Sequence, residues 1–257
     1  METVVLNGVV AGEGDGLVLL HPIGLDHSFW GGLPARLARH RRVLALDLRG
    51  FGGSPPGPGR MPIAAYAADV RAAMVQHGME RADVVGLSFG GLIAQTLALD
   101  FPHAVSRLVL CGCTAGIPPE ARNVLRERGL AAERGGMEAV VPATIARWFT
   151  AGFADEPVVE RVRARLRSDS VAAWSDGWHA IAEFDARPRL GRLEVPTLVV
   201  AGEVDAANTA AAAQALADAI PGARLVTLPG APHMMQLEAE EAFADAVESF
   251  LAEPQPR

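Results

Sequence analysis

The 257-residue sequence predicts one α/β domain built on a mainly parallel, doubly wound sheet. Short, wholly apolar runs of strand length, typical of strands buried on both faces, alternate with segments of helical apolar spacing. The alternation stops over residues 116–192, where no strand pattern occurs. We therefore expect an eight-stranded, mostly parallel sheet flanked by helices, with a helical cap (residues 116–192) inserted before the penultimate strands. Residues 1–115 and 193–257 then form the core.

Eight segments have the length and composition of strands. The first two, Val4–Leu6 and Val9–Ala11, predict an opening hairpin. The other six are apolar runs that we expect in the parallel part of the sheet: Leu17–Leu20, Val43–Leu46, Val84–Leu87, Leu108–Cys111, Leu198–Ala201 and Leu225–Leu228. Because parallel strands end at the same edge of a sheet, the loops that follow them meet there.

Helical spacing marks segments between the strands and within the insertion. The core helices are predicted at Phe29–Leu37, Ile63–Gln76, Phe89–Leu99 and around an apolar stripe of Phe243, Val247, Phe250 and Leu251. Two stripes in the insertion consist of Val158, Val162 and Leu166, and of Trp174, Trp178 and Ile181. Insertions at the carboxyl edge of such sheets commonly shape binding sites, so we expect the cap to cover one.

Composition excludes several classes of function. The net charge of −7 argues against a broad nucleic-acid-binding face. Every apolar run is shorter than the roughly 18 residues of a membrane span, and Met1–Gly8 lacks the pattern of a signal peptide, so a cytoplasmic protein with no membrane partner is expected. Two cysteines, Cys111 and Cys113, are too few for a structural zinc site and are expected to be buried apolar side chains.

The motif Gly-x-Ser-x-Gly occurs between a predicted strand and a predicted helix, with Ser88 at its centre. In that context the turn is so sharp that the residues two before and two after the serine must lack side chains. Gly86 and Gly90 meet this requirement, and Gly91 lets the helix pack closely. The turn presents the hydroxyl above the sheet, where it becomes a nucleophile if a base takes its proton. Ser88 is the predicted nucleophile.

His233 is the predicted general base. In a strand–turn–helix serine site of this kind the residues follow the order Ser, then Asp or Glu, then His. His233 alone among the seven histidines lies in the loop between the last strand and the last helix. The other six precede the serine or lie in loops, at helix ends or in the insertion: His21, His27, His40, His77, His103 and His179.

Asp205 is the predicted acid that orients the histidine. It lies in the turn after the penultimate strand, beyond Gly202, with Glu203 as the alternative carboxylate. The preceding strand is followed by residues 111–115, which include no carboxylate. The acid holds the histidine tautomer and stabilises the imidazolium without taking the proton.

Two backbone amides are expected to form an oxyanion hole, those of Ile23 and Phe89. Phe89 follows the nucleophile, and Ile23 is the third residue of the loop after the Leu17–Leu20 strand. Pro22 has no N–H to give. A second glycine-rich loop, residues 47–54, is followed at once by prolines rather than a helix, so it does not predict a dinucleotide site. We expect it to be structural, with Asp47 paired to Arg49.

With these motifs in place, the sequence resembles the α/β-hydrolase superfamily over nearly its whole length. The resemblance is carried by the loop His21–Gly24, by Asp-x-Arg-Gly-x-Gly-x-Ser at residues 47–54, by the serine motif, and by Asp205 and His233. Within the superfamily it is most similar to the 3-oxoadipate enol-lactonase branch, over residues 107–111, 136–137, 146–150 and 220–226.

This resemblance implies a serine hydrolase that opens an unsaturated lactone bearing a free carboxylate, in aromatic catabolism and without a cofactor. It also implies that Arg147 and Trp148 face the pocket from the cap, with Arg147 binding the substrate carboxylate. The alternative is that Arg147 is solvated and Trp148 belongs to the core of the cap. The chain departs from the branch at Pro22 and at residues 206–209, which lack a common proline.

Ser88, Asp205 and His233 are also compatible with other functions. One is a broad-specificity carboxylesterase, or a cofactor-free haloperoxidase or C–C hydrolase. Another is a ligand receptor that keeps a hydrolase core and turns over barely at all. In each case the expected partner is a small molecule, and the expected state is a monomer or homodimer.

Overall fold

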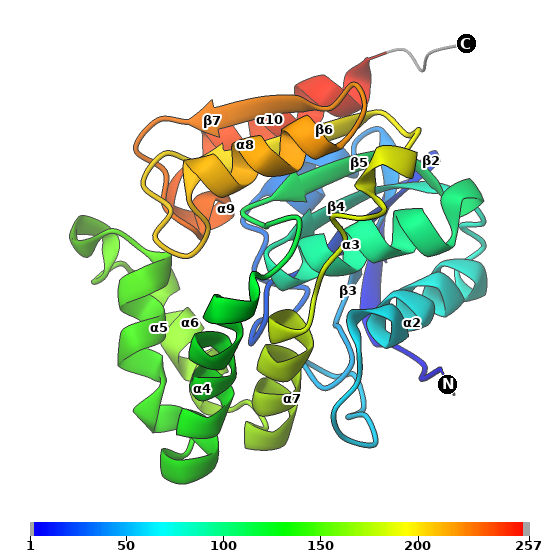
Figure 1. The fold of residues 1–257 in the computed structure, drawn as a ribbon. Helices are drawn as coiled ribbons and strands as arrows, with labels where there is room; N and C mark the ends of the chain where they lie inside the picture. The colour runs from blue at the N-terminus through cyan, green and yellow to red at the C-terminus, as the bar shows by residue number, and fades with distance from the viewer. Residues whose placement is uncertain (1–2, 254–257) are drawn as a thin grey trace.

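A computed structural model describes residues 3–253, whose centre is a seven-stranded sheet (Figure 1). The strand order is β1-β3-β2-β4-β5-β6-β7; β1 is antiparallel to β3, and all other neighbours are parallel. The strands are β1 (Gly8–Ala11), β2 (Asp15–Leu20), β3 (Arg41–Leu46), β4 (Ala82–Leu87), β5 (Val105–Cys111), β6 (Thr197–Gly202) and β7 (Arg224–Leu228). The predicted mostly parallel α/β sheet is confirmed.

The expected eighth strand and the opening hairpin are wrong. Residues 4–6 form no strand, and β1 pairs with β3 instead of with its own neighbour in sequence. The backbone N–H of Val4 donates to Asp69 Oδ1 at 3.1 Å, and that of Asn7 donates to Ser54 Oγ at 2.8 Å. The side chain of Asp69 therefore takes a backbone donor of Val4 that the hairpin would have used.

Helices cover both faces of the sheet. Helices α2 (Ile63–Gln76), α3 (Phe89–Asp100) and α8 (Ala210–Ala219) pack in the larger apolar cluster, and α1 (Leu33–Leu37) and α10 (Glu240–Ala252) pack in the cluster on the opposite face (Figure 1). A short α9 (Met235–Glu238) precedes α10. Helix α1 is shorter than predicted because Gly31 has φ +58°, which interrupts a helix before Leu33. No helix in residues 3–253 is both long and apolar enough to cross a membrane.

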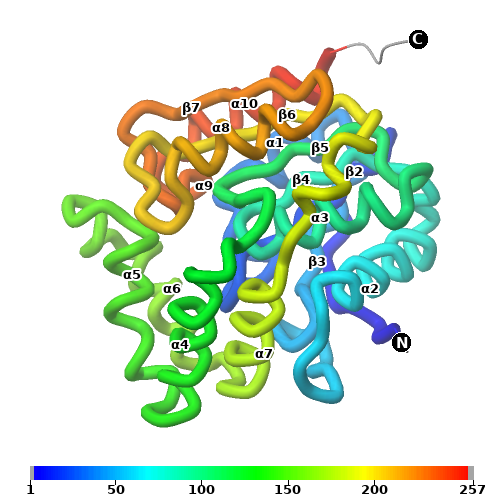
Figure 2. The backbone as a smooth tube through the Cα atoms, viewed as in Figure 1, coloured from blue at the N-terminus to red at the C-terminus, as the bar shows by residue number. Residues whose placement is uncertain are grey.

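Four helices make up most of the segment between β5 and β6, residues 116–192, which we call the cap. They are α4 (Pro119–Gly135), α5 (Val141–Trp148), α6 (Pro157–Arg167) and α7 (Val171–Ala182). Figures 1 and 2 show them gathered together on one side of the sheet. The two ends of the cap meet, because Ile117 N–H donates to Phe184 O and Ala186 N–H donates to Ala115 O, each at 2.9 Å.

One buried carboxyl of the cap makes stability depend on pH. Asp169, between α6 and α7, has a side chain with no exposed surface, and burial raises its pKa to about 8, although Arg165 opposes the shift. Between its ordinary pKa of 3.8 and about 8, the unfolded chain releases a proton that the folded chain keeps. Stability is therefore lost as pH rises through this window and is level above it.

We expect Asp169→Asn to remove this slope. Urea unfolding of the variant and the parent at about pH 5 and about pH 8 measures it, and the stability difference should favour the variant increasingly toward the higher pH. Burial lowers the pKa of His21 to about 4, which gives the opposite slope below pH 6.5. Because both proteins contain His21, its contribution cancels in the difference. A difference that does not change with pH contradicts the prediction.

Candidate active site

The carboxyl ends of four parallel strands, β2, β4, β6 and β7, bring the predicted site residues of the core together. Strands β2 and β4 are neighbours at the point where the strand order reverses, with Leu20 opposite Gly86. The loop after β2 therefore begins beside the turn after β4, which holds Ser88. On the other side, β6 lies next to β7, with Gly202 opposite Leu228, so the loops that carry Asp205 and His233 also meet. Such a reversal creates a crevice in an open α/β sheet.

Ser88 occupies a strained turn between β4 and α3. Its φ of 53° and ψ of −113° make it the sole non-glycine residue with positive φ in the described part of the chain. Such a conformation costs about 1–3 kcal/mol and clusters at functional sites. A side chain at Gly86 would overlap the carbonyl of Gly90, and one at Gly90 would overlap the carbonyl of Leu20. The two glycines are thus required for the turn that leaves Ser88 partly exposed.

Asp205 and His233 form a buried, hydrogen-bonded pair. His233 Nδ1 lies 2.9 Å from Asp205 Oδ2, and both residues are at least nine-tenths buried. Asp205 Oδ1 accepts hydrogen bonds from the backbone N–H groups of Ala207 (2.7 Å) and Asn208 (2.8 Å). The ionised carboxylate only accepts hydrogen bonds, so Nδ1 of the neutral imidazole carries the proton and Nε2 is left with a lone pair.

Glu203, the alternative acid, lies elsewhere. It is exposed, and its Oε2 accepts a hydrogen bond from the backbone N–H of Gly230 at 2.8 Å. The two carboxylates lie two positions apart, both after Gly202, yet only that of Asp205 turns inward. A side chain at Gly202 would overlap the carbonyl of Ala231, so the glycine lets the loops of β6 and β7 approach each other.

Ser88 and His233 line one pocket between the sheet and the cap, together with Ile23 and Phe89. No hydrogen bond joins the Ser88 hydroxyl to His233 in residues 3–253. Contacts of this kind are often long in unliganded sites and tighten in the complex. The other lining residues are Leu92, Cys113, Thr114, Ile117, Leu125, Arg128, Trp148, Trp178, Ile181, Ala207 and Asn208.

The amides of Ile23 and Phe89 are available as donors. Neither N–H makes a hydrogen bond within the described residues. The loop that carries Ile23 is held by His21, whose Nδ1–H donates to Pro22 O at 2.7 Å while its Nε2 accepts from Leu48 N–H at 2.9 Å. Two free amides beside a partly exposed hydroxyl are an arrangement that can stabilise a tetrahedral oxyanion.

The structure separates the two predicted cap residues. Trp148 lines the pocket, and its ring centroid lies 6.3 Å from that of His233. Arg147 is half-buried and is not among the residues that line the pocket. The arginine found there is Arg128 of α4, which was not predicted from the sequence. Helix α4 is rich in charged residues and has only two buried positions. It therefore lacks the apolar periodicity that would have predicted a helix facing the pocket.

Asp47 does not pair with Arg49, contrary to expectation. Asp47 accepts hydrogen bonds from the side chain of Asn7, from Gly53 N–H and from His27, whereas Arg49 pairs with the buried carboxylate of Asp69 on α2. The loop 47–54 is therefore tied to its surroundings at both ends, consistent with the structural role predicted for it.

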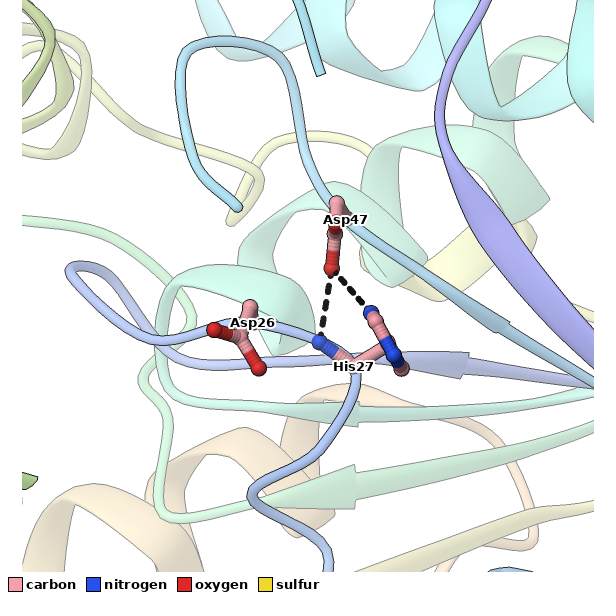
Figure 3. A group of neighbouring side chains, drawn as sticks. All are labelled: Asp26, His27 and Asp47. Carbon is pink, nitrogen blue, oxygen red and sulfur yellow. Dashed lines mark hydrogen bonds and ion pairs between the residues drawn. The ribbon is translucent and has the colours of Figure 1, made fainter. Parts of the chain in front are cut away.

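A metal ion could be considered at Asp26, His27 and Asp47, whose potential ligand atoms lie within 4.8 Å of one another (Figure 3). The hydrogen bonds of Asp47 involve both of its carboxylate oxygens, and Oδ1 is shared by the N–H and Nδ1 of His27. Asp26 Oδ1 accepts from Ser28, and its Oδ2 pairs with Arg165. The cluster is therefore satisfied by protein donors and favours a structural role.

Comparison with known proteins agrees with this fold. A sequence model of the family described as alpha/beta hydrolase fold matches residues 16–240. The 3-oxoadipate enol-lactonase 2 of Acinetobacter baylyi is 31% identical over 254 residues, covering 97% of this chain and 94% of that protein. A pimeloyl-[acyl-carrier protein] methyl ester esterase of Aeromonas hydrophila is 28% identical, covering 93% of this chain and 96% of its own. The crystal structure of the enol-lactonase from Burkholderia xenovorans LB400 is similar with a TM-score of 0.92 and 35% identity, covering 96% of each chain.

Proposed function

Because this chain belongs to the α/β-hydrolase family and is similar to lactone- and ester-cleaving enzymes, we propose that it hydrolyses a small acidic lactone through an acyl-enzyme on Ser88. The proposed substrate is 3-oxoadipate enol-lactone or a close relative. The observation that carries the proposal is the buried His233–Asp205 hydrogen bond at a pocket that Ser88 also lines.

The reaction begins with proton transfer from Ser88 to His233. The serine oxygen attacks the carbonyl carbon, and the lone pair of Nε2 takes the serine proton. Asp205 stabilises the imidazolium because its Oδ2 accepts a hydrogen bond from Nδ1–H, which keeps its proton. The oxyanion is held by the amides of Ile23 and Phe89. When the ring C–O bond breaks, His233 returns the proton to the leaving oxygen, and water then repeats both steps on the acyl-enzyme.

We assign to Arg128 the role of binding the substrate carboxylate. No carboxylate pairs with its guanidinium anywhere in residues 3–253; instead it lies over the Trp178 ring, 4.7 Å from the centroid. Burial lowers the pKa of Arg128 to about 10, and the nearby charge of Arg147 adds to the effect. A partly buried cation without a counter-ion gains from binding an anion. Arg147, the residue implied by the resemblance, then contributes positive potential behind it.

We expect Arg128→Met to weaken only the reaction of acidic substrates. For a p-nitrophenyl hemiester of a short dicarboxylic acid, kcat/KM falls about 10- to 100-fold, as expected for one charge-assisted hydrogen bond. For the neutral p-nitrophenyl ester of equal chain length it changes little. Arg147→Met is the matched control, with a smaller loss on the hemiester. Equal losses on both esters would mean that Arg128 supports the fold instead; a larger effect at Arg147 would restore the original assignment.

A second candidate is an esterase for neutral acyl chains. Leu92, Ile117, Leu125 and Ile181 also line the pocket, and one relative is a methyl ester esterase. Comparing kcat/KM of the wild-type protein for 3-oxoadipate enol-lactone and for a short neutral p-nitrophenyl ester separates the two. Preference for the lactone supports the proposal. Efficient ester cleavage with little lactone turnover favours the esterase, and ligand-dependent cap movement with negligible turnover favours a receptor.

A further inference from the structure

We propose that Arg165, in the cap, is a positioning residue for the oxyanion hole: through Asp26 it fixes the loop that presents the Ile23 amide. The inference rests on the proposed function, since it takes Ile23 as an oxyanion donor. It assigns to the cap a part in the chemistry, in addition to covering the pocket.

The loop that follows β2 is anchored on the core at both ends. His21 bonds to the backbone at Leu48, as described above, and the N–H and Nδ1 of His27 lie 2.8 and 2.7 Å from Asp47 Oδ1 (Figure 3). These anchors leave the residues between them, which include Ile23, to be placed by other contacts.

The middle of the loop packs directly on the cap. A Cβ atom at Gly24 would lie 2.6 Å from both Leu166 Cδ2 and Trp174 Cζ3. The side chain of Ile23 approaches α7 at Gly177. A Cβ atom at Gly177 would lie 2.8 Å from Ile23 Cδ1. These contacts are apolar. They hold the loop against the cap, but because apolar contacts are non-directional they do not fix the orientation of its backbone amides.

Arg165 supplies a charged link, through ion pairs that do not have hydrogen-bond geometry. Its Nε lies 2.9 Å from Asp26 Oδ2, and its Nη2 lies 2.6 Å from Asp169 Oδ1. Its Nη1 donates a hydrogen bond to Ser168 Oγ at 2.8 Å, which fixes the guanidinium beside the two carboxyl groups. The side chains of Asp26 and Arg165 are only 15% and 16% exposed, which limits screening of the pair by solvent.

Asp26 transmits this restraint to the loop backbone. Its Oδ1 accepts from the N–H and Oγ of Ser28 at 2.9 and 2.7 Å, which leaves Oδ2 for Arg165. The carboxylate therefore joins the loop to α6 three residues after Ile23. An oxyanion donor stabilises the transition state only when it is close to the position of the developing charge. Loss of the link is thus expected to affect the transition state more than substrate binding.

The test compares Asp26→Asn, Arg165→Met and the double variant, with Arg167→Met as control. Arg167 lies on the same helix but pairs with Glu138 and Glu160 within the cap. Asp26→Asn keeps both the Ser28 bonds and the Arg165–Asp169 pair, so it remains informative if Arg165→Met does not fold. The measurements are kcat and KM for a short p-nitrophenyl ester and Ki for an alkyl trifluoromethyl ketone, which forms a tetrahedral adduct with Ser88.

We expect each single variant to lower kcat about 10- to 100-fold, to raise Ki of the ketone in parallel, and to leave KM nearly unchanged. The double variant is no worse than the more impaired single variant, because both remove one link. Arg167→Met matches the wild type. Unchanged kcat and Ki in Asp26→Asn, additive losses, or a change in KM alone would overturn the inference.

A separate control distinguishes failure of the proposed function. Wild-type protein that neither turns over ester or lactone nor reacts with a fluorophosphonate at Ser88 contradicts the proposed function and the inference with it. Turnover and labelling at Ser88, combined with wild-type behaviour of the Asp26 and Arg165 variants, contradicts the inference alone.

Discussion

Replacing Ser88 with alanine is expected to lower kcat/KM for esters and lactones by at least about 10⁴-fold while leaving the protein folded. The loss follows because no other hydroxyl occupies the turn that the strained backbone places beside the free amides. The fold is retained because Ser88 is partly exposed and is not part of the apolar core. Steady-state kinetics and thermal unfolding of the purified variant measure the two effects.

Ser88→Gly provides the matched comparison. Glycine adopts φ 53° without strain, so this variant is expected to be about 1 kcal/mol more stable than Ser88→Ala and equally inactive. A Ser88→Ala protein that keeps a tenth of the wild-type rate would remove Ser88 as the nucleophile. One that fails to fold would show that the hydroxyl is needed for the turn itself.

Asp205→Asn is expected to lower kcat about 10³- to 10⁴-fold with KM little changed. The amide oxygen can still accept from the N–H groups of Ala207 and Asn208, so the loop keeps its shape. The amide nitrogen, however, then faces Nδ1 of His233, and two donors cannot bond. The imidazole takes the tautomer with its proton on Nε2, which can no longer accept a proton from Ser88.

Glu203→Gln tests the same assignment from the other side. It changes an equal charge two residues away, but this side chain is exposed and its oxygen can still accept from Gly230 N–H. We expect activity within about 2-fold of the wild type, in the range of surface substitutions. If Glu203→Gln were the inactive variant, or if both were equally impaired, the acid would not be Asp205.

The parallel strands could be predicted because burial on both faces leaves a simple pattern. The runs at Leu17–Leu20 and Val84–Leu87 each end at the residue where the structure ends β2 and β4. The closeness of Asp205 to His233 was also predictable, since parallel topology places the loops that follow successive strands at one edge of the sheet. Catalytic roles for these residues remain proposals that the variants above test.

The features that could not be predicted from the sequence depend on contacts between residues that are distant in sequence. Val4–Leu6 has the composition of a strand, yet Asp69 takes one of the backbone donors. Arg49 pairs with that same Asp69 instead of with Asp47, because α2 brings the more distant carboxylate under the loop. Arg128 could not be found because a helix with mostly exposed residues lacks the apolar periodicity by which helices are recognised in sequence.

The closed neck of the cap, where Ile117 meets Phe184 and Ala186 meets Ala115, bears on how this enzyme can diversify. The chain leaves the core at the carboxyl end of β5 and comes back through the neck at Phe184 and Ala186. Residues 187–196 then lead to the amino end of β6, the adjacent parallel strand. Whatever lies beyond the neck can lengthen, shrink or be exchanged without altering the register of the strands that support Ser88 and the His233–Asp205 pair. Since loop-closure entropy rises only slowly with length, such exchanges cost little stability. Selectivity and reactivity can therefore evolve on separate parts of one chain, provided that each new cap again supports the loop at Ile23.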